Sequence, residues 1–323
     1  MLSRLFLIAA LLVSAPQFAA AASPYPDHTV RIIVPYAPGG GVDGLARALA
    51  DNFSRAWNQS VIVENKSGAS TMLGGEAVAR APKDGYTLLL TSDTSITSNP
   101  FLFKRQPYDP VKDLAPVTQL IDLHQIVVVH PSVPVSTLKE LADYAKANPN
   151  KLSYGSYGKG SQPDLLFETV KAQTGASILP VPFRGIAPAI LATLNGEVQM
   201  TLGSPAVVGQ HIKAGKMKAL AVGKGERLKD FPDIPTLKEA GFANAEPLSW
   251  FGLFAPAGTP PDIVAKIQQT AAAALSEPAF KARFIDAAGF EAVGSTPQAF
   301  SDFIAKDLEQ KRKLIETAKI TPE

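Results

Sequence analysis

Short apolar runs recur along the chain, and most are followed by a turn and then by apolar residues at helical spacing. In the clearest unit, residues 31–36 form an apolar run with β-branched side chains, which is typical of a buried parallel strand. A glycine-rich turn follows, and Asp43 then stands where it can cap the first turn of a helix. The residues that repeat at helical spacing there are Leu45, Ala46, Leu49, Phe53 and Trp57.

The same alternation continues through the chain. Further strands are predicted at residues 61–64, 86–91, 126–130, 151–156, 178–183, 198–202, 218–222 and 250–255. Further helices are predicted at residues 74–81, 137–147, 162–174, 187–195, 206–213, 260–275, 278–288 and 297–319. Thr137 and Glu140 form a capping box, and Gly175 is placed to end its helix. Strands that alternate with helices predict mostly parallel sheets flanked by helices, an α/β fold.

The residue composition of the sequence changes at two places. Residues 108–134 begin as a proline-containing loop and end in a strongly apolar strand, and residues 223–247 are dense in glycine, proline and charge. We interpret both segments as crossings between two domains. Domain 1 is predicted to comprise residues 23–124 and 248–323, and domain 2 residues 125–247. A hinged pair of this kind leaves a cleft between its domains, a usual place for a small ligand.

The first 22 residues have the pattern of a secretory signal peptide. Arg4 precedes an apolar run over residues 5–13, and small residues end at Ala22. The run is too short to span a membrane. The chain has no cysteine, so we expect neither a lipid anchor nor a disulfide in a soluble, periplasmic protein.

Charge and motifs exclude several classes of function. The 31 basic residues nearly balance the 29 acidic ones and form no block, so nucleic acid is not an expected partner. His28, His124, His130 and His211 lack a metal-ligand spacing, and no Gly-x-Ser-x-Gly nucleophile motif occurs. We therefore expect neither a metal site nor catalytic residues.

Two glycine-rich stretches resemble nucleotide loops without completing the pattern. In residues 155–161, Lys159 precedes Gly160, whereas a phosphate-binding loop requires the lysine directly after the glycine. Gly39, Gly41 and Gly44 match Gly-x-Gly-x-x-Gly, but only Glu64 offers an acidic residue near the end of the next strand. We expect no cofactor.

Backbone donors and hydroxyl groups remain at the carboxyl ends of the predicted strands, where α/β sheets bind ligands. Gly39, Gly40 and Gly41 precede a helix, so their N–H groups are open to an anion. Hydroxyl groups follow the strands in residues 67–75, 91–97 and 156–161. Each serine or threonine alone is as well explained as a helix cap or turn former. Several of them meeting in one cleft would instead form an anion site.

A series of ordered motifs extends over nearly all of the chain. The motifs are Ile33-Val34-Pro35-Tyr36-Ala37-Pro38-Gly39-Gly40-Gly41-Val42-Asp43, Val63-Glu64-Asn65-Lys66-Ser67-Gly68-Ala69, Asp84-Gly85-Tyr86-Thr87-Leu88-Leu89, Val181-Pro182-Phe183-Arg184-Gly185, Gly215-Lys216-Met217-Lys218-Ala219-Leu220 and Trp250-Phe251-Gly252-Leu253-Phe254-Ala255-Pro256. Together they resemble the receptors of tripartite tricarboxylate transporters, the Bug-type family. The resemblance implies a two-domain flytrap fold that closes over a small organic carboxylate and delivers it to a membrane permease.

The resemblance also implies which residues bind the ligand. They are Tyr36, Pro38, Gly39, Gly40, Asp43, Ser70, Thr71, Ser95, Ser156, Gly160, Ser161, Arg184 and Ser204. The chain departs from the family where it has Ser70, Thr71 and Met72 in place of Gly-Gly-Asn, and Asp93, Thr94 and Ser95 in place of Asn-Gly-Thr. These positions border the implied pocket, so the resemblance does not identify the carboxylate.

The sequence thus predicts a monomeric periplasmic solute receptor without catalytic activity. Two alternatives use the same scaffold. One is an exported hydrolase that uses a serine of the cleft. The other is a sensor that presents its ligand-bound form to a membrane kinase.

Overall fold

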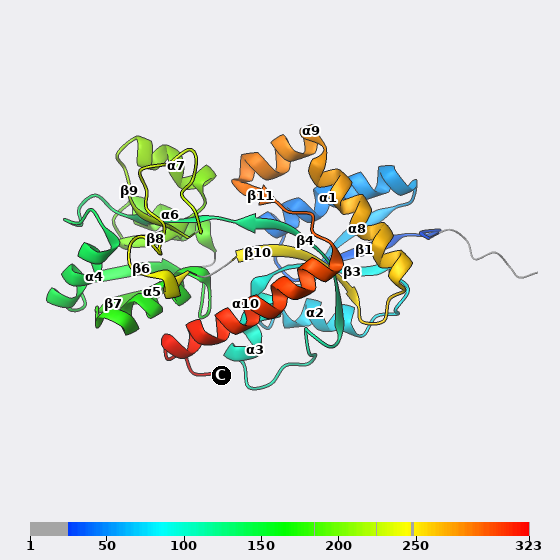
Figure 1. Ribbon diagram of the computed structural model, residues 1–323, viewed down its shortest axis with the longest axis horizontal. Coiled ribbons are helices and arrows are strands. Elements are labelled where there is room, and N and C mark those ends of the chain that lie inside the picture. Colours follow the sequence, from blue (N-terminus) through cyan, green and yellow to red (C-terminus); the bar gives the residue numbers. More distant parts are fainter. Residues whose placement is uncertain (1–24, 184, 224, 247–248, 323) are drawn as a thin grey trace, which may run out of the picture.

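The computed structural model describes residues 25–183, 185–223, 225–246 and 249–322, which form two lobes, each built on one sheet (Figure 1). The predicted signal peptide and Arg184 lie outside these residues. Within them, no helix combines the length and the apolar character needed to cross a bilayer.

The first lobe contains a six-stranded sheet of order β11-β4-β10-β3-β1-β2. Its strands are β1 (Val30–Val34), β2 (Val61–Asn65), β3 (Thr87–Ser92), β4 (Leu114–Leu123), β10 (Ser249–Pro256) and β11 (Phe290–Ala292). Its helices are α1 (Gly41–Trp57), α2 (Met72–Ala79), α3 (Asn99–Leu102), α8 (Pro261–Ser276), α9 (Pro278–Phe280) and α10 (Pro297–Thr317). A π-helical turn over Thr94–Ser98 follows β3, and two short turns over Lys281–Ile285 and Asp286–Ala288 follow α9.

The second lobe contains a five-stranded sheet of order β7-β6-β8-β5-β9. Its strands are β5 (Gln125–Val129), β6 (Leu152–Ser156), β7 (Ile178–Pro182), β8 (Met200–Gly203) and β9 (Lys218–Gly223). Its helices are α4 (Leu138–Ala147), α5 (Gln162–Thr174), α6 (Ile186–Leu194) and α7 (Pro205–Lys213). A short 3₁₀ turn over Ala243–Ala245 precedes the return to the first lobe.

Both sheets are mixed. β1 pairs in parallel with β2 and β3, and β6 pairs in parallel with β7 and β8, which confirms the predicted alternation. The strands that connect the lobes run antiparallel to these neighbours: β10 pairs with β3 and β4, and β5 with β8 and β9. Each lobe therefore has a parallel half, whose strand ends can carry a ligand site, and an antiparallel half that joins it to the other lobe.

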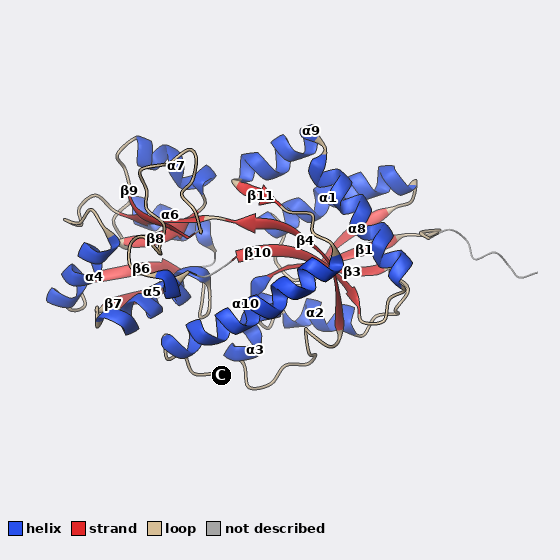
Figure 2. Cartoon of the chain, viewed as in Figure 1, coloured by secondary structure: helices blue, strands red, loops and turns tan. Residues whose placement is uncertain are grey.

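Helices cover both faces of each sheet (Figure 2). Successive side chains of a strand point to opposite faces of the sheet, so each strand contributes to the core on either side. In β1, Ile32 and Val34 face a core that includes Leu49 of α1, whereas Ile33 faces a second core that includes Phe300 of α10. All five side chains are almost fully buried. The strands therefore read as continuous apolar runs, as expected for strands that are buried on both faces.

Helix α10 belongs to the first lobe but extends to the second. It runs diagonally across the molecule toward the lower end of the second lobe in Figure 1. Near its end, Leu314 and Ile315 pack with Leu102 of α3 and Leu165 of α5 in one apolar cluster. This helix therefore ties the two lobes together along one side.

Two strands were not predicted from the sequence. β4 lies where a loop was expected, because Pro116 interrupts its apolar pattern. Pro116 pairs with Phe254 next to a shift in register, a position that tolerates a residue without an N–H group. β11 has only three residues and pairs with the end of β4.

The predicted cap of α1 also needs correction. The N-cap is Gly40, and Asp43 lies inside the first turn, where its carboxylate accepts a hydrogen bond from the Gly39 N–H at 2.9 Å. The capping box of α4 and the Gly175 cap of α5 are confirmed: Thr137 Oγ1 accepts from the Glu140 N–H, and Gly175 has a φ of 73°.

Candidate functional site

The carboxyl ends of five parallel strands meet at one cavity between the lobes. Tyr36 follows β1, Ser67 follows β2 and Thr94 follows β3 in the first lobe; Tyr157 follows β6 and Phe183 follows β7 in the second. The cavity has a volume of about 600 Å³. The other residues that line it are Pro35, Ala37, Gly68, Ser70, Thr71, Leu102, Phe103, Gly158, Lys159, Ser161 and Gly185. This edge is where α/β sheets bind ligands.

The loop between β2 and α2 has an unusual backbone at this cavity. Gly68, Ala69, Ser70 and Thr71 all have positive φ angles, of 135°, 45°, 49° and 77°. Such angles are rare for residues other than glycine, and for a β-branched threonine they are an outlier. Among the described residues, the N–H groups of these four residues have no hydrogen-bond acceptor. Strained loops of this kind concentrate at functional sites, and successive free N–H groups form a concavity for anions.

A chain of buried hydroxyl groups supports this loop from behind. Ser95 Oγ donates to Thr71 Oγ1 at 2.7 Å and lies 2.5 Å from Thr91 Oγ1. Asn99 Nδ2 donates to the Ser70 carbonyl at 2.7 Å. Ser95 is fully buried, whereas Ser70 is exposed to the cavity. The hydroxyl-rich run over residues 91–99 therefore supports the strained loop, and within this run only Thr94 lines the cavity.

Asp43 holds the turn between β1 and α1. Its carboxylate accepts hydrogen bonds from the Gly39 N–H, from Arg47 at 2.9 and 3.0 Å and from Asn65 Nδ2 at 2.8 Å. Burial raises the pKa of Asp43, but the donors outweigh it and hold the pKa below its ordinary value. Because these donors already occupy both of its oxygens, Asp43 shapes the turn rather than facing the cavity.

On the second lobe, the turn before α5 is held in a similar way. The Gly160 N–H donates to Asp164 Oδ2 at 2.8 Å, and Tyr154 donates its hydroxyl to Asp164 Oδ1 at 2.7 Å. Ser161 Oγ donates to the Gly158 carbonyl at 2.6 Å and lines the cavity. Gly160 itself lies against Leu102 of the first lobe. The two carboxylates, Asp43 and Asp164, thus occupy equivalent positions at the starts of helices that flank the cavity.

Comparison with known proteins identifies the family of this chain. Residues 45–320 match the family model described as the tripartite tricarboxylate transporter family receptor. Protein BugT of Bordetella pertussis is 32% identical over 96% of this chain and 95% of its own length. The chain belongs to this receptor family.

Solved structures of related proteins have the same two-lobed fold. The R. palustris protein Rpa4515 with adipate is 32% identical to this chain. The match covers 93% of this chain and 100% of the solved chain, with a TM-score of 0.81. MatC from Rhodopseudomonas palustris with bound malate is 28% identical to this chain. The match covers 90% of this chain and 100% of the solved chain, with a TM-score of 0.78. The receptor is therefore a periplasmic-binding-protein fold of the Bug type, as its motifs indicate.

The predicted binding residues fall into three groups in this receptor. Four of them line the cavity: Tyr36, Ser70, Thr71 and Ser161. Those that lie beside or behind the lining are Pro38, Gly39, Gly40, Asp43, Ser95, Ser156 and Gly160. Ser204 caps α7 next to Pro205, which lines a different hollow, and Arg184 is outside the described residues. Which of them contact a ligand stays a prediction.

Sequence reasoning missed most of the apolar lining. Phe103, Tyr157 and Phe183, together with the charged Lys159, line the cavity but were not among the predicted binding residues. Tyr157 and Lys159 stand between the glycines and serines of the turn 155–161, so their positions alone could have indicated them. Phe103 could not be assigned, because it reaches the site from the end of α3, whose place depends on the fold.

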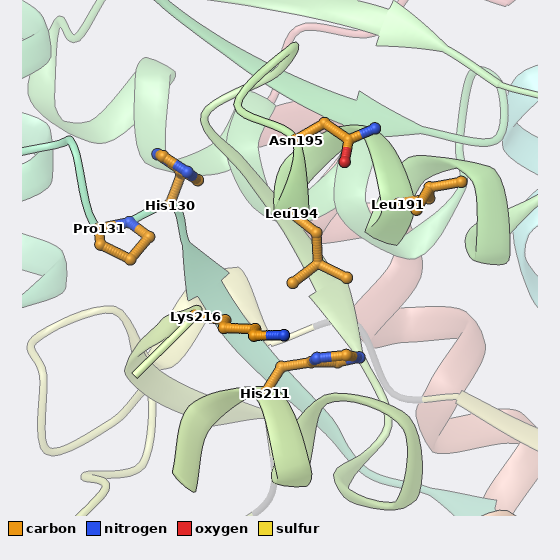
Figure 3. Close-up of a pocket in the computed structure, with 7 residues that line it drawn as sticks. All are labelled: His130, Pro131, Leu191, Leu194, Asn195, His211 and Lys216. Atoms are coloured by element: carbon orange, nitrogen blue, oxygen red, sulfur yellow. The ribbon is translucent and has the colours of Figure 1, made fainter. Parts of the chain in front are cut away.

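Two other hollows differ from this one in their lining. The first lies on the second lobe alone, where His211 and Lys216 extend into a space bounded by Leu191 and Leu194, with His130 at its other side (Figure 3). The second lies between the lobes beside β11 and is lined by charges of both signs, including Arg227, Lys281 and Glu291. Of the predicted binding residues that the structure describes, none lines either hollow.

Histidines and clustered metal ligands are absent from the cavity lining in the described part of the chain. None of the four histidines lines the cavity, and His28, His124 and His130 are bonded to Asp27, Glu291 and Ser132 instead. Within the same residues, no group of three or more His, Asp or Glu side chains could hold a metal ion. The family to which the chain belongs consists of substrate-binding receptors.

Proposed function

We propose that the receptor binds a small organic carboxylate in the cavity between Tyr36, Thr71 and Ser161, and that the carboxylate is held by the left-handed loop over residues 68–71. The observation that carries this proposal is the row of N–H groups in that loop, which have no acceptor among the described residues. Backbone donors of this kind favour a negative group. Adipate and malate in two solved relatives support the same chemical class.

The binding energy comes from several modest terms. Micromolar binding requires a binding free energy of about 8 kcal/mol. Charge-assisted hydrogen bonds contribute about 1.5–3 kcal/mol each, so three of them together with apolar contacts in a closed cavity reach that value. The ligand touches both lobes only when they are closed, so it stabilises the closed state. We propose that the lobes are the domains 23–124 with 248–323 and 125–247, because β4 ends at Leu123 and β5 begins at Gln125.

A thermal-shift and calorimetric panel of mono-, di- and tricarboxylates tests the function. We expect at least one acid to raise Tm and to bind with micromolar or tighter affinity. Thr71→Val and Ser161→Ala should each weaken that binding about 3- to 30-fold, as expected for the loss of one hydrogen bond. Ser276→Ala, on the exposed face of α8, is the matched control and should bind as the unaltered receptor does. If no acid of the panel raises Tm, the proposal that the ligand is a carboxylate is wrong.

We further propose that the receptor is exported through residues 1–22 and passes its ligand, unchanged, to a membrane permease of the tripartite tricarboxylate type. The family description supports the permease, and the absence of a histidine among the described lining residues supports binding without turnover. Mass spectrometry of the bound acid after prolonged incubation should recover it intact. Copurification from membranes should identify the permease, whereas recovery of a membrane kinase would favour the sensor alternative.

A further inference from the structure

Four aromatic rings form much of the cavity wall, two from each lobe. Tyr36 and Phe103 belong to the first lobe, and Tyr157 and Phe183 to the second. All four are partly exposed. Within the part of the chain that the structure describes, none of them packs against another aromatic ring, whereas the core rings of Trp250 and Phe300 lie 5.2 Å apart. Partly exposed ring faces gathered in one hollow indicate a ligand that covers them.

The hydroxyl groups of the two tyrosines lie in polar surroundings next to the cavity. The Tyr36 hydroxyl lies 2.7 Å from Ser92 Oγ. Burial of the Tyr157 hydroxyl and the nearby Asp93 carboxylate raise the pKa of Tyr157, so this phenol stays neutral. The Tyr36 hydroxyl is thus held at the end of β3, and the Tyr157 hydroxyl is buried near Asp93, which follows β3, while both residues line the cavity.

The charges at the cavity match an acid and not an amino acid. Among the described residues that line it there is no Asp or Glu, so an ammonium group on the ligand would lack a counter-charge. Asp93 does not supply one, because it is 1% exposed and paired with Lys311 at 3.0 Å. Lys159 is exposed at the rim, where its Nζ donates to the Thr321 carbonyl at 2.9 Å. The lining thus combines hydroxyl groups and free N–H groups with apolar ring faces.

We infer that the acid bound by this receptor carries an aromatic ring, which lies between Tyr157 and Phe183 of the second lobe and Tyr36 and Phe103 of the first. The inference rests on the proposed carboxylate site, since the carboxylate end is assigned to the loop over residues 68–71. Rings at 4.5–7 Å between centroids gain stabilisation beyond the burial of their area, and a saturated chain does not obtain that gain. Closure of the lobes places the ligand ring between the two pairs.

Calorimetry with matched acids tests the inference. Benzoate and cyclohexanecarboxylate have the same charge and number of carbon atoms, but only benzoate is flat and aromatic. We expect benzoate to bind about 3- to 10-fold more tightly than cyclohexanecarboxylate, and more tightly than adipate or malate. If the saturated ring or either aliphatic diacid binds as tightly as benzoate, the aromatic inference is wrong while the carboxylate receptor stands. Failure of every acid in the broad panel would overturn both.

Variants of the wall locate the preference. Phe183→Leu and Tyr157→Leu keep an apolar side chain but remove a ring face, so we expect the ratio of the benzoate and cyclohexanecarboxylate affinities to fall toward one. Phe101→Leu is the control, because Phe101 packs in the cluster around Leu102 without lining the cavity. Phe183→Tyr should keep the ratio. The ratio of the two affinities does not depend on the fraction of folded protein. If this ratio is unchanged in both leucine variants, the assignment of the ligand ring to Tyr157 and Phe183 is wrong.

Discussion

At Gly160, the lobes lie so close that a single methyl group would overlap a side chain of the first lobe. Its φ is +74°, and a Cβ built there would lie 2.1 Å from Leu102 Cδ1 of the first lobe. Gly160→Ala therefore combines a left-handed backbone, which costs about 1–2 kcal/mol, with a clash between the lobes. We expect a lower free energy of unfolding by at least that amount and weaker binding of the ligand, measured by urea denaturation and calorimetry.

Gly40 provides the matched control for that variant. It has a φ of −82°, and no atom lies within 4 Å of the position of a Cβ. Because Gly40 is the N-cap of α1, Gly40→Ala should lower the free energy of unfolding by at most about 1 kcal/mol, the cost of a poorer cap without a clash. Equal effects of the two substitutions would show that the contact between Gly160 and Leu102 does not limit the approach of the lobes.

Asp43 makes the stability of the first lobe depend on pH. Its folded pKa is held below the ordinary value, so its contribution is present above that value, near 4, and is lost as pH falls through the folded pKa. We expect Asp43→Asn to lower the free energy of unfolding by about 1–3 kcal/mol at pH 7, and by less at pH 3. Urea denaturation at both values measures the difference.

The exposed pair of Lys281 and Asp286 is the comparison for Asp43. Asp286→Asn removes an ion pair of 3.1 Å whose side chains are about half exposed, so stability should change by about 0–1 kcal/mol at most. A loss for Asp43→Asn that is as small as this would mean that its four donors find other acceptors.

Among single residues, the sequence indicated several hydroxyl groups that line the cavity, but only one of its four aromatic rings. Ser70, Thr71 and Ser161 were identified because hydroxyl groups at strand ends are visible in the sequence. The positive φ angles at Ala69 and Thr71 could not be predicted, because neither residue type favours them. The hydrogen bonds of Thr71 to Ser95 and of Ser70 to Asn99 impose this backbone from a distance in sequence.

At the level of elements, helices and central strands followed from local patterns, and the crossing strand β4 did not. α5 matches its predicted bounds, because a cap, an apolar stripe and Gly175 all indicate the same ends. β4 is a strand because β10 and β11 pair with it on its two sides. Such pairing joins residues more than 100 positions apart, which no local window detects.

Helix α10 carries a buried ion pair that fixes its position. Lys311 Nζ lies 3.0 Å from Asp93 Oδ2, and both side chains are almost fully buried. Lys311→Met leaves the Asp93 carboxylate buried without its cation, so we expect the free energy of unfolding to fall by about 3–5 kcal/mol. Chemical denaturation should show a smaller loss at pH 5 than at pH 8, because protonation of Asp93 removes the uncompensated charge.

The double variant Lys311→Met with Asp93→Asn separates charge from packing. Removing both charges should recover much of the lost stability, since replacing a whole buried pair is often close to neutral. If the double variant is as unstable as Lys311→Met, the defect lies in the packing of α10 and not in the unpaired carboxylate.

At the level of the whole molecule, the two lobes are joined by a small number of specific contacts beyond the crossing strands. Gln162, at the start of α5, donates to Ser249 Oγ at 2.7 Å and to Asp93 Oδ1 at 3.2 Å. Leu165 of the same helix packs with Leu314 and Ile315 of α10. All of these contacts lie on the side of α5, next to the cavity. The distance between the lobes at the ligand site therefore depends on groups that do not touch the ligand.

Gln162→Ala tests this dependence. The substitution removes two buried hydrogen bonds that exist only while α5 lies against the first lobe, a loss of about 1–3 kcal/mol in that arrangement. We expect the ligand-free receptor to have a larger radius of gyration by small-angle scattering. Binding should also weaken several-fold, because part of the binding energy must then restore the contact between the lobes.

Gln298→Ala, which removes an exposed bond to Asp302 within α10, should change neither the radius nor the affinity. Saturating ligand should return Gln162→Ala to the radius of the unaltered complex, because the ligand stabilises only the closed arrangement. A variant that stays expanded with ligand bound would show that Gln162 maintains the structure of the hinge itself. A variant with unaltered radius and affinity would show that the other contacts between the lobes, such as those of α10 and of Gly160 with Leu102, hold the lobes at their distance without Gln162.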